Sequence, residues 1–158
     1  MRIEMRTMLK KIWMAVLVIC MFTACAGEIA PPVAEPIDYT TFCGHYSDTE
    51  TVEGPCYTVS ILGADNEAKT IEIQISYVGP HSSPVYTTEL IEVFIADDHT
   101  VQFEWTDSWS NEGTGTLVLD PDDPSVVQLT MTVTKEAEVN RATLSTHGES
   151  RTLNRRAD

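Results

Sequence analysis

Basic residues are scarce in this sequence. It has 10 Lys or Arg against 24 Asp or Glu, which gives a net charge of −14. A domain that binds nucleic acid needs a basic surface, so this balance argues against a nucleic-acid partner. An acidic surface suits a cationic peptide or protein, although solubility alone also accounts for one.

Motifs for metal, phosphate and nucleophile chemistry are missing. The sequence has no CxxC or HxxxH spacing, no G-x-S-x-G and no glycine-rich phosphate loop, so we predict no metal centre and no cofactor. Glu104 and Asp107 flank Trp105, as paired carboxylates do in glycan hydrolysis, but Glu104 alternates with inward residues and should face water. The acidic turns 97–98 and 120–123 lack the twelve-residue calcium-loop pattern. We therefore predict that the chain is not an enzyme.

Apolar runs long enough to span a bilayer are also missing. Residues 1–11 carry Arg2, Arg6, Lys10 and Lys11, and the uncharged run Ile12–Phe22 that follows has eleven residues. A membrane span needs about 20 apolar residues. A basic start followed by a short apolar run is typical of a secretory signal.

This signal ends in Phe22-Thr23-Ala24-Cys25, which resembles the lipobox of bacterial lipoproteins, with Phe22 where that family usually has Leu. Cys20 is the poorer candidate because the bulky Ile19 precedes it. The resemblance implies cleavage after residue 24 and lipidation of Cys25. It also implies a lipid anchor on the outer face of a bacterial membrane, at the cell surface or on the periplasmic side. An uncleaved anchor and a plain secretory signal are the alternatives.

Cleavage of residues 1–24 would remove four bases and one acid, leaving 6 bases against 23 acids and a net charge of −17. Residues 25–38 are rich in proline and acids, and we predict a disordered tether there. Residues 39–158 are predicted to form a single domain. The cysteines Cys43 and Cys56 are an even pair in an exported chain, and we predict a disulfide between them.

Helix signals are almost absent from residues 39–158, whereas strand signals recur. The clearest strand is 70–78, in which Ile71, Ile73 and Ile75 alternate with polar residues. Similar patterns predict further strands over residues 43–46, 55–62, 86–96, 101–106, 115–119, 127–134, 142–146 and 151–154. Eight or nine strands joined by short turns predict an all-β, antiparallel up-and-down meander. This meander should curl into a closed or nearly closed barrel, with a β-sandwich as the alternative.

Gly44-His45-Tyr46 opens the first strand and resembles the G-x-W motif of calycin-type, lipocalin-like barrels, with Tyr in place of Trp. Segment 107–117 and an arginine near the last strand, Arg151 or Arg155, add to the resemblance. In that family an aromatic residue of the first strand packs beside an arginine of the last and closes one end of the barrel. The resemblance implies a binding role, and the small size of the domain favours a solid core over a cavity.

Three aromatic residues are candidates for a ligand or partner surface: Tyr86, Trp105 and Trp109. Trp109 lies in a predicted loop at a barrel end, where exposed aromatics often mark recognition surfaces. The alternative is that Trp109 caps the core. We predict a membrane-anchored, non-catalytic binding module for a small ligand, a peptide or an envelope partner. A structural subunit of an envelope complex, with a solid core, is the alternative.

Overall fold

A computed structural model describes residues 36–50, 55–82, 85–138 and 144–157. The chain divides into two units, residues 1–36 and 37–158, and all strands of the described residues belong to the second. The predicted signal peptide 1–24, the predicted lipidation site Cys25 and the predicted tether up to residue 35 lie outside the described residues. The interpretations of these segments therefore stay predictions.

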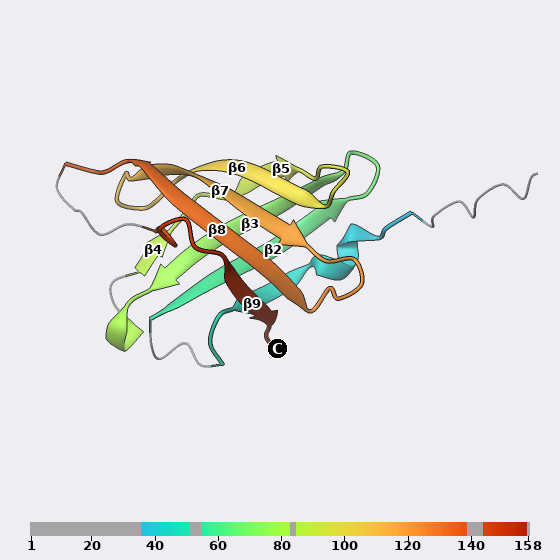
Figure 1. The fold of residues 1–158 in the computed structure, drawn as a ribbon, viewed down its shortest axis with the longest axis horizontal. Coiled ribbons are helices and arrows are strands. Elements are labelled where there is room, and N and C mark those ends of the chain that lie inside the picture. Colours follow the sequence, from blue (N-terminus) through green and yellow to red (C-terminus); the bar gives the residue numbers. More distant parts are fainter. Residues whose placement is uncertain (1–35, 51–54, 83–84, 139–143, 158) are drawn as a thin grey trace, which may run out of the picture. The chain divides into compact units, whose positions relative to one another are not determined.

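The described residues form strands and short 3₁₀ helices and contain no α-helix, which confirms the predicted all-β class (Figure 1). Alternating apolar residues, many of them β-branched, favour this extended structure. The 3₁₀ helices are η2 (Tyr39–Phe42) and η3 (Pro80–Ser82). The strands are β1 (Gly44–Ser47), β2 (Cys56–Asp65), β3 (Thr70–Val78), β4 (Val85–Thr87), β5 (Ile91–Phe94), β6 (Thr100–Thr106), β7 (Glu112–Leu119), β8 (Val126–Lys135) and β9 (Arg151–Arg155).

The strands make one antiparallel sheet in the order β4-β3-β2-β1-β9-β8-β7-β6, with β5 paired to β3 beside β4. The first and last strands are therefore neighbours. Over the described residues, the two edges of the sheet meet only at the isolated bridges Thr88–Asp107 and Ile95–Val101. The predicted meander has thus curled into a nearly closed barrel, and two separate packed sheets do not form.

The interior is apolar because each strand turns alternate residues inward. On β3, Ile71, Ile73 and Ile75 are buried, whereas Glu72 is exposed. Most residues that the same alternation turns inward on the other strands are buried as well, namely Val59, Ile61, Val93, Ile95, Val101, Phe103, Leu117, Leu119, Val127, Leu129 and Met131. Ile91 and Val133 are partly buried against this core. These side chains form one continuous hydrophobic core, whose burial is the main driving force for folding.

The predicted strand 86–96 is interrupted between β4 and β5. Opposite this segment, β3 advances by three residues (76 to 73) while the paired chain advances by four (87 to 91). The extra residue forms a β-bulge, which bends the strand and breaks its ladder. Thr88 still donates a backbone hydrogen bond of 2.9 Å to β3.

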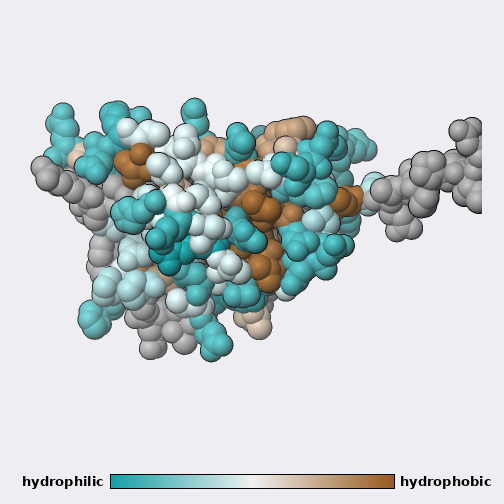
Figure 2. All heavy atoms as spheres, in the orientation of Figure 1, coloured by the Kyte–Doolittle hydropathy of each residue, from teal (hydrophilic) through white to brown (hydrophobic). Residues whose placement is uncertain are grey.

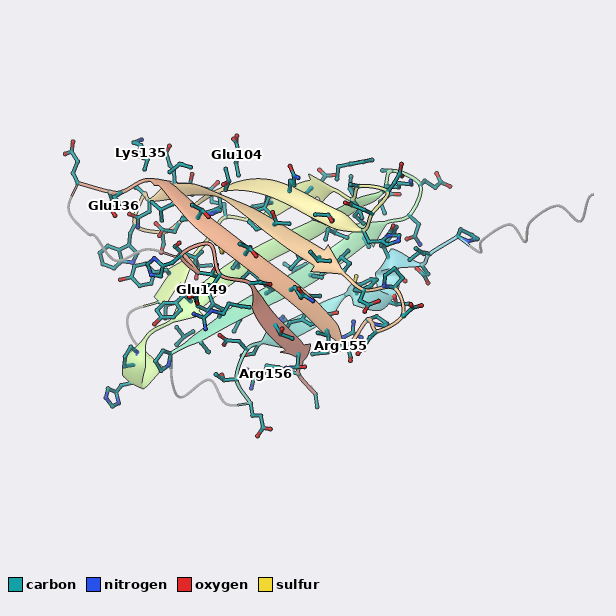
Figure 3. All side chains as sticks on the ribbon, in the orientation of Figure 1. Glu104, Lys135, Glu136, Glu149, Arg155 and Arg156 are labelled. Carbon is teal, nitrogen blue, oxygen red and sulfur yellow. The ribbon has the colours of Figure 1, made fainter. Side chains whose placement is uncertain are left out.

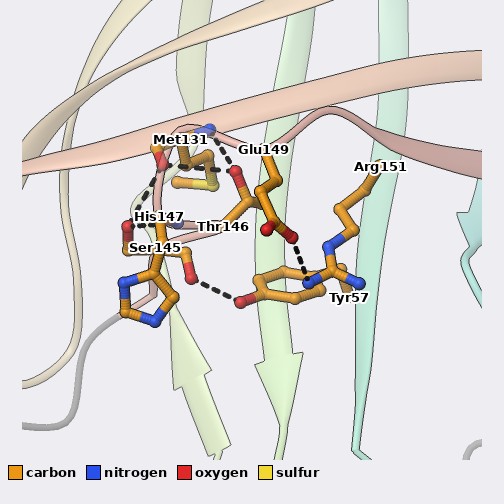
Figure 4. Close-up of polar contacts among 7 residues, drawn as sticks. All are labelled: Tyr57, Met131, Ser145, Thr146, His147, Glu149 and Arg151. Atoms are coloured by element: carbon orange, nitrogen blue, oxygen red, sulfur yellow. Dashed lines mark hydrogen bonds and ion pairs between the residues drawn. The ribbon is translucent and has the colours of Figure 1, made fainter.

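The predicted strand 142–146 does not form over its described residues. In its place residues 144–147, named here the strap, lie against β8. The hydroxyls of Ser145 and Thr146 donate to the Met131 carbonyl at 3.1 and 3.3 Å, and the Thr146 hydroxyl accepts the Met131 N–H at 2.9 Å (Figure 4). Side-chain hydrogen bonds therefore take the place of a strand ladder here.

Side chains close both ends of the barrel. The end at which the domain begins holds η2 and the fully buried Phe42, and the opposite end holds the strap and the fully buried Leu144. Tyr39 fixes η2 to two turns, because its N–H donates to Asn66 Oδ1 at 2.8 Å and its hydroxyl lies 3.0 Å from His99 Nδ1. Between these two ends the buried apolar side chains form one cluster.

Two glycines of β7 make room for aromatic rings of β6. Gly113 lies opposite Trp105, and Gly115 lies opposite Phe103. A Cβ atom at Gly113 would come within 2.3 Å of both the Trp105 ring and the Thr132 carbonyl oxygen. Both rings therefore pack directly on the β7 backbone, and this close approach requires residues without a side chain.

Candidate functional site

The loop after β6 holds Trp109 in place through the carboxylate of Asp107. One oxygen of this carboxylate accepts hydrogen bonds from the backbone N–H of Trp109 at 2.9 Å and from the backbone N–H of Asn111 at 3.0 Å. The other oxygen accepts the Asn111 side-chain amide at 2.8 Å. Asp107 and Asn111 are both buried, whereas the Trp109 side chain is 46% exposed. A buried polar network thus presents a large aromatic side chain to solvent.

Trp109 is the outermost member of a row of aromatic rings at the strap end of the barrel. The Trp109 and Tyr86 ring centroids lie 6.1 Å apart. The row continues through Tyr77 at 6.2 Å to Tyr57 at a further 4.9 Å. These separations are those of favourable tilted aromatic pairs. We name Tyr57, Tyr77, Tyr86 and Trp109 the aromatic row.

Tyr57 connects the inner end of this row to the strap. Its hydroxyl donates a hydrogen bond of 2.5 Å to the Ser145 carbonyl, and the Arg151 guanidinium carbon lies 5.8 Å from its ring centroid (Figure 4). Burial raises the pKa of Tyr57, and the neighbouring Tyr77 adds to that rise. Arg151 also forms an ion pair of 3.3 Å with Glu149. The strap end therefore combines aromatic faces with one cationic group, a combination that suits stacking on a ligand.

Of the three aromatic residues predicted to form a surface, the structure brings Tyr86 and Trp109 together and buries Trp105 in the core. Trp105 is 3% exposed, and its indole N–H donates to the Thr114 carbonyl at 3.0 Å. It belongs to the core, because the alternation along β6 turns it inward. Tyr86 is buried too and supports Trp109 from beneath, so Trp109 alone of the three is well exposed.

The carboxylates considered as catalytic or calcium-binding candidates lie in separate environments or accept hydrogen bonds from backbone N–H groups. Glu104 is exposed on the outside of β6, whereas the Asp107 carboxylate is buried in the loop network. Asp120 and Asp123 accept backbone N–H groups within their own turn, at 3.0 and 3.1 Å. Among the residues that the structure describes, no three His, Cys, Asp or Glu side chains come close enough to hold a metal ion.

Both Cys43 and Cys56 are free thiols in this structure, so the predicted disulfide is not formed. The register explains this difference. Gly44, next to Cys43, pairs with Ile61, and Cys56 lies five residues from Ile61 along β2. At about 3.3 Å per residue these five residues alone span roughly 16 Å, and Cys43 lies one residue further still from Cys56. A disulfide requires Cα atoms within about 7 Å.

Two parts of this end could not be located from the sequence. Tyr57 lies in phase with Val59 and Tyr77 with Ile75 along their strands. Their position next to Tyr86 depends on the register of β2, β3 and β4, which the sequence does not show. The Asp107–Asn111 network is hinted at only by the turn-forming residues of Asp107-Ser-Trp-Ser-Asn111.

No helix among the described residues is both long enough and apolar enough to cross a membrane. Comparison of the chain with family models, with curated proteins and with solved structures found no match.

Proposed function

We propose that this chain is an exported, membrane-anchored, non-catalytic binding module. Cys25 carries the lipid anchor, and the Trp109 end of the barrel carries the binding surface. The observation that supports this surface most strongly is the exposure of Trp109 on a loop fixed by buried polar groups. A large rigid aromatic contributes contact area at low entropic cost, which is why such residues recur in binding hot spots.

The position of Trp109 within the domain suits this role. The domain begins beside η2, which Tyr39 holds to the turns containing Asn66 and His99. Trp109 follows the opposite end of β6, beyond residue 106 (Figure 1). A tether that joins the domain at η2 therefore leaves the Trp109 end unobstructed by the point of attachment.

The continuous apolar core directs the search for a ligand to the surface. Ile73, Val93, Phe103 and Leu129, which would line a hollow barrel, are buried in the continuous core. A ligand at the Trp109 end would contact Trp109 directly, with Tyr86 behind it. The candidates are a small ligand, a peptide or an envelope protein.

A structural subunit of an envelope complex is the second candidate. Large apolar side chains that reach solvent favour it, among them Leu62, Leu90 and Phe94. In the view of Figure 2, hydrophobic residues reach the surface in small groups between hydrophilic ones. On this face the apolar surface is divided, whereas an obligate interface buries a large and predominantly apolar area.

The anchor is tested by replacing Cys25 with Ser in the producing cell. We expect the variant to leave the membrane fraction and to lose incorporation of labelled fatty acid, because one thiol carries the attachment. Cys20→Ser is the matched control and should remain with the membrane. Membrane pelleting of the Cys25→Ser variant would contradict the anchor.

The binding surface is tested by tryptophan fluorescence of the purified protein. After signal removal Trp105 and Trp109 are the remaining tryptophans, and Trp105 is buried. Titration with a soluble envelope oligosaccharide, a neutral peptide and a basic peptide should give a saturable change with one of them. Trp109→Ala should abolish that change and Trp109→Phe should weaken it. A complete absence of saturable change would favour the structural subunit.

A further inference from the structure

Glutamates line up across three strands on the outside of the barrel. Glu72 of β3 lies directly opposite Glu92 of β5. The bridge Ile95–Val101 sets the antiparallel register of β5 against β6. In this register Glu92, three residues before Ile95, lies opposite Glu104, three residues after Val101. All three are exposed because they alternate with inward residues, and Figure 3 shows Glu104 projecting away from β6.

Two further glutamates extend this line into a band. Glu89 and Glu112 border, together with Glu104, a surface groove of about 510 Å³. A second groove of about 300 Å³ is lined in part by Glu72 and Glu92. We name these five glutamates the acidic band. The band covers the seam between β5 and β6. Between the bridges Ile95–Val101 and Thr88–Asp107, these two strands form no ladder of hydrogen bonds.

The acidic band repels itself when nothing is bound to it. The Ile95 N–H donates to the Lys69 carbonyl at 2.8 Å, and this bond sets the alternation of hydrogen-bonded pairs along β5 and β3. Glu72 and Glu92 consequently form a non-hydrogen-bonded pair, in which side chains approach most closely. Like charges placed opposite each other in this way are destabilising.

Compensation within the protein is slight. Over the described residues, one ion pair reaches the acidic band, from Lys135 to Glu112 at 2.5 Å, and these side chains are 66% and 45% exposed. Exposed ion pairs contribute little to stability. Four of the five glutamates therefore lack a cationic partner among the described residues.

Large apolar side chains lie beside these glutamates. Phe94, two residues beyond Glu92, is 59% exposed, and Leu90, two residues before it, is 51% exposed. Leu62 lies at the bulge of β2 opposite Glu72 and is 53% exposed. On this surface negative charges thus alternate with exposed apolar side chains. Solubility accounts for exposed acids but not for large apolar side chains between them.

We propose that the acidic band docks a basic, amphipathic segment of a partner protein, in which Lys or Arg alternate with apolar residues. The cationic groups would offset the repulsion between Glu72, Glu92 and Glu104. The apolar residues would cover Leu90 and Phe94. A strand-like segment suits the surface, because its side chains recur at the spacing of the neighbouring strands. The net charge of −14 would also speed the approach of such a partner.

A metal ion fits this surface less well than an extended cation. The glutamates are spread along three strands, and the described residues hold no group of three carboxylates or other ligands that converge on one point. The proposal rests on the role of the chain as a binding module but not on Trp109. The two surfaces can therefore be tested with separate variants, and each can fail alone.

The test uses the full-length protein in neutral detergent and a dye-labelled peptide of alternating Lys and Leu. Fluorescence anisotropy should show saturable binding that weakens as salt is added. The double variant Glu72→Gln/Glu92→Gln should raise Kd about fivefold, since each exposed charge pair contributes up to about 1 kcal/mol. Glu50→Gln/Asp122→Asn removes the same charge elsewhere and should leave Kd within about twofold of the wild-type value.

Three further measurements make the result decisive. The Glu72→Gln/Glu92→Gln variant should melt no lower than the wild type, because it relieves repulsion, so weaker binding cannot be attributed to unfolding. Phe94→Ser should raise the Kd of the Lys–Leu peptide, and Trp109→Ala should leave this Kd unchanged. Equal Kd values for the two double variants would overturn the proposal. So would equally tight binding of a Glu–Leu peptide, or no binding of the Lys–Leu peptide.

Discussion

Arg155 of the last strand donates a hydrogen bond of 2.6 Å to the hydroxyl of Tyr46 on the first strand, and its guanidinium carbon lies 5.3 Å from the Tyr46 ring centroid. Arg155 also donates to the Thr41 carbonyl. The buried Tyr46 hydroxyl lies 2.8 Å from the Phe42 carbonyl and 2.9 Å from that of Pro124. The side chains of Tyr46 and Arg155 thus connect the first strand, the last strand, η2 and the β7–β8 turn. The resemblance to calycin-type barrels implied a contact of this kind.

Tyr46→Phe tests this contact by removing one oxygen atom and keeping the ring. We expect a loss of about 1–3 kcal/mol in the free energy of unfolding, because buried carbonyls and Arg155 lose their partner. Urea unfolding measures the change. Tyr77→Phe is the matched control, since the Tyr77 hydroxyl forms no hydrogen bond with the described residues. Equal losses in the two variants would show that the Tyr46 hydroxyl has no special role.

The strand pattern could be predicted because it depends on neighbours in sequence. Ile71, Ile73 and Ile75 alternate with polar residues whatever strand they pair with. The bulge between β4 and β5 and the strap could not be predicted in this way. The bulge depends on the register against β3, and the strap depends on hydroxyls that bond to Met131, 14 and 15 residues away. Distant contacts of this kind leave no local pattern.

The candidate site shows the same division. The alternation along β6 turned Trp105 inward, and the turn residues around Trp109 placed it in a loop, so their different exposures follow from local sequence. That Tyr86 lies behind Trp109 follows instead from the bridge between Thr88 and Asp107, which closes the sheet. The contact between Tyr86 and Trp109 cannot be predicted from the sequence until the strand register is known.

Alkaline conditions should destabilise the domain through two tyrosines. Burial raises the pKa of both Tyr46 and Tyr57 above 10.0, the usual tyrosine value. The unfolded chain therefore loses these protons first, and stability falls as the pH rises above about 10 and through the pKa values of the folded state.

Urea midpoints measured from pH 8 to pH 11 should decline in the wild type. The decline should be smaller in Tyr46→Phe/Tyr57→Phe, since the variant lacks both protons. An identical slope in the two proteins would refute the role of these tyrosines.

Gly113→Ala should destabilise the sheet by about 1–3 kcal/mol, the usual result of overpacking. The new Cβ would lie 2.3 Å from the Thr132 carbonyl oxygen, which belongs to the backbone of β8 and cannot move aside. In the control, Gly63→Ala, the nearest atom is the end of the Glu72 side chain at 3.3 Å. Thermal unfolding should show a large shift for the first variant and a small one for the second. Similar shifts would mean that Trp105 and β8 yield more easily than the structure indicates.

The two cysteines of the domain should behave as independent thiols. Burial raises the pKa of Cys43, which slows its alkylation at neutral pH, and Cys56 is fully buried at the start of β2. Mass spectrometry without reductant should find neither cysteine linked to the other. In native protein Cys43, which is half-buried, should react before Cys56, and urea should expose both.

Serine variants separate this outcome from a disulfide without any chemical labelling. Cys56→Ser places a hydroxyl in the buried end of β2 and should lower the free energy of unfolding by about 1–3 kcal/mol. Cys43→Ser should cost less, since its side chain is half-buried. A disulfide would instead make the two single variants lose similar amounts, because each would break the same bond. Equal losses, together with a linked Cys43–Cys56 peptide, would require β1 to pair with β2 in a register other than Gly44–Ile61.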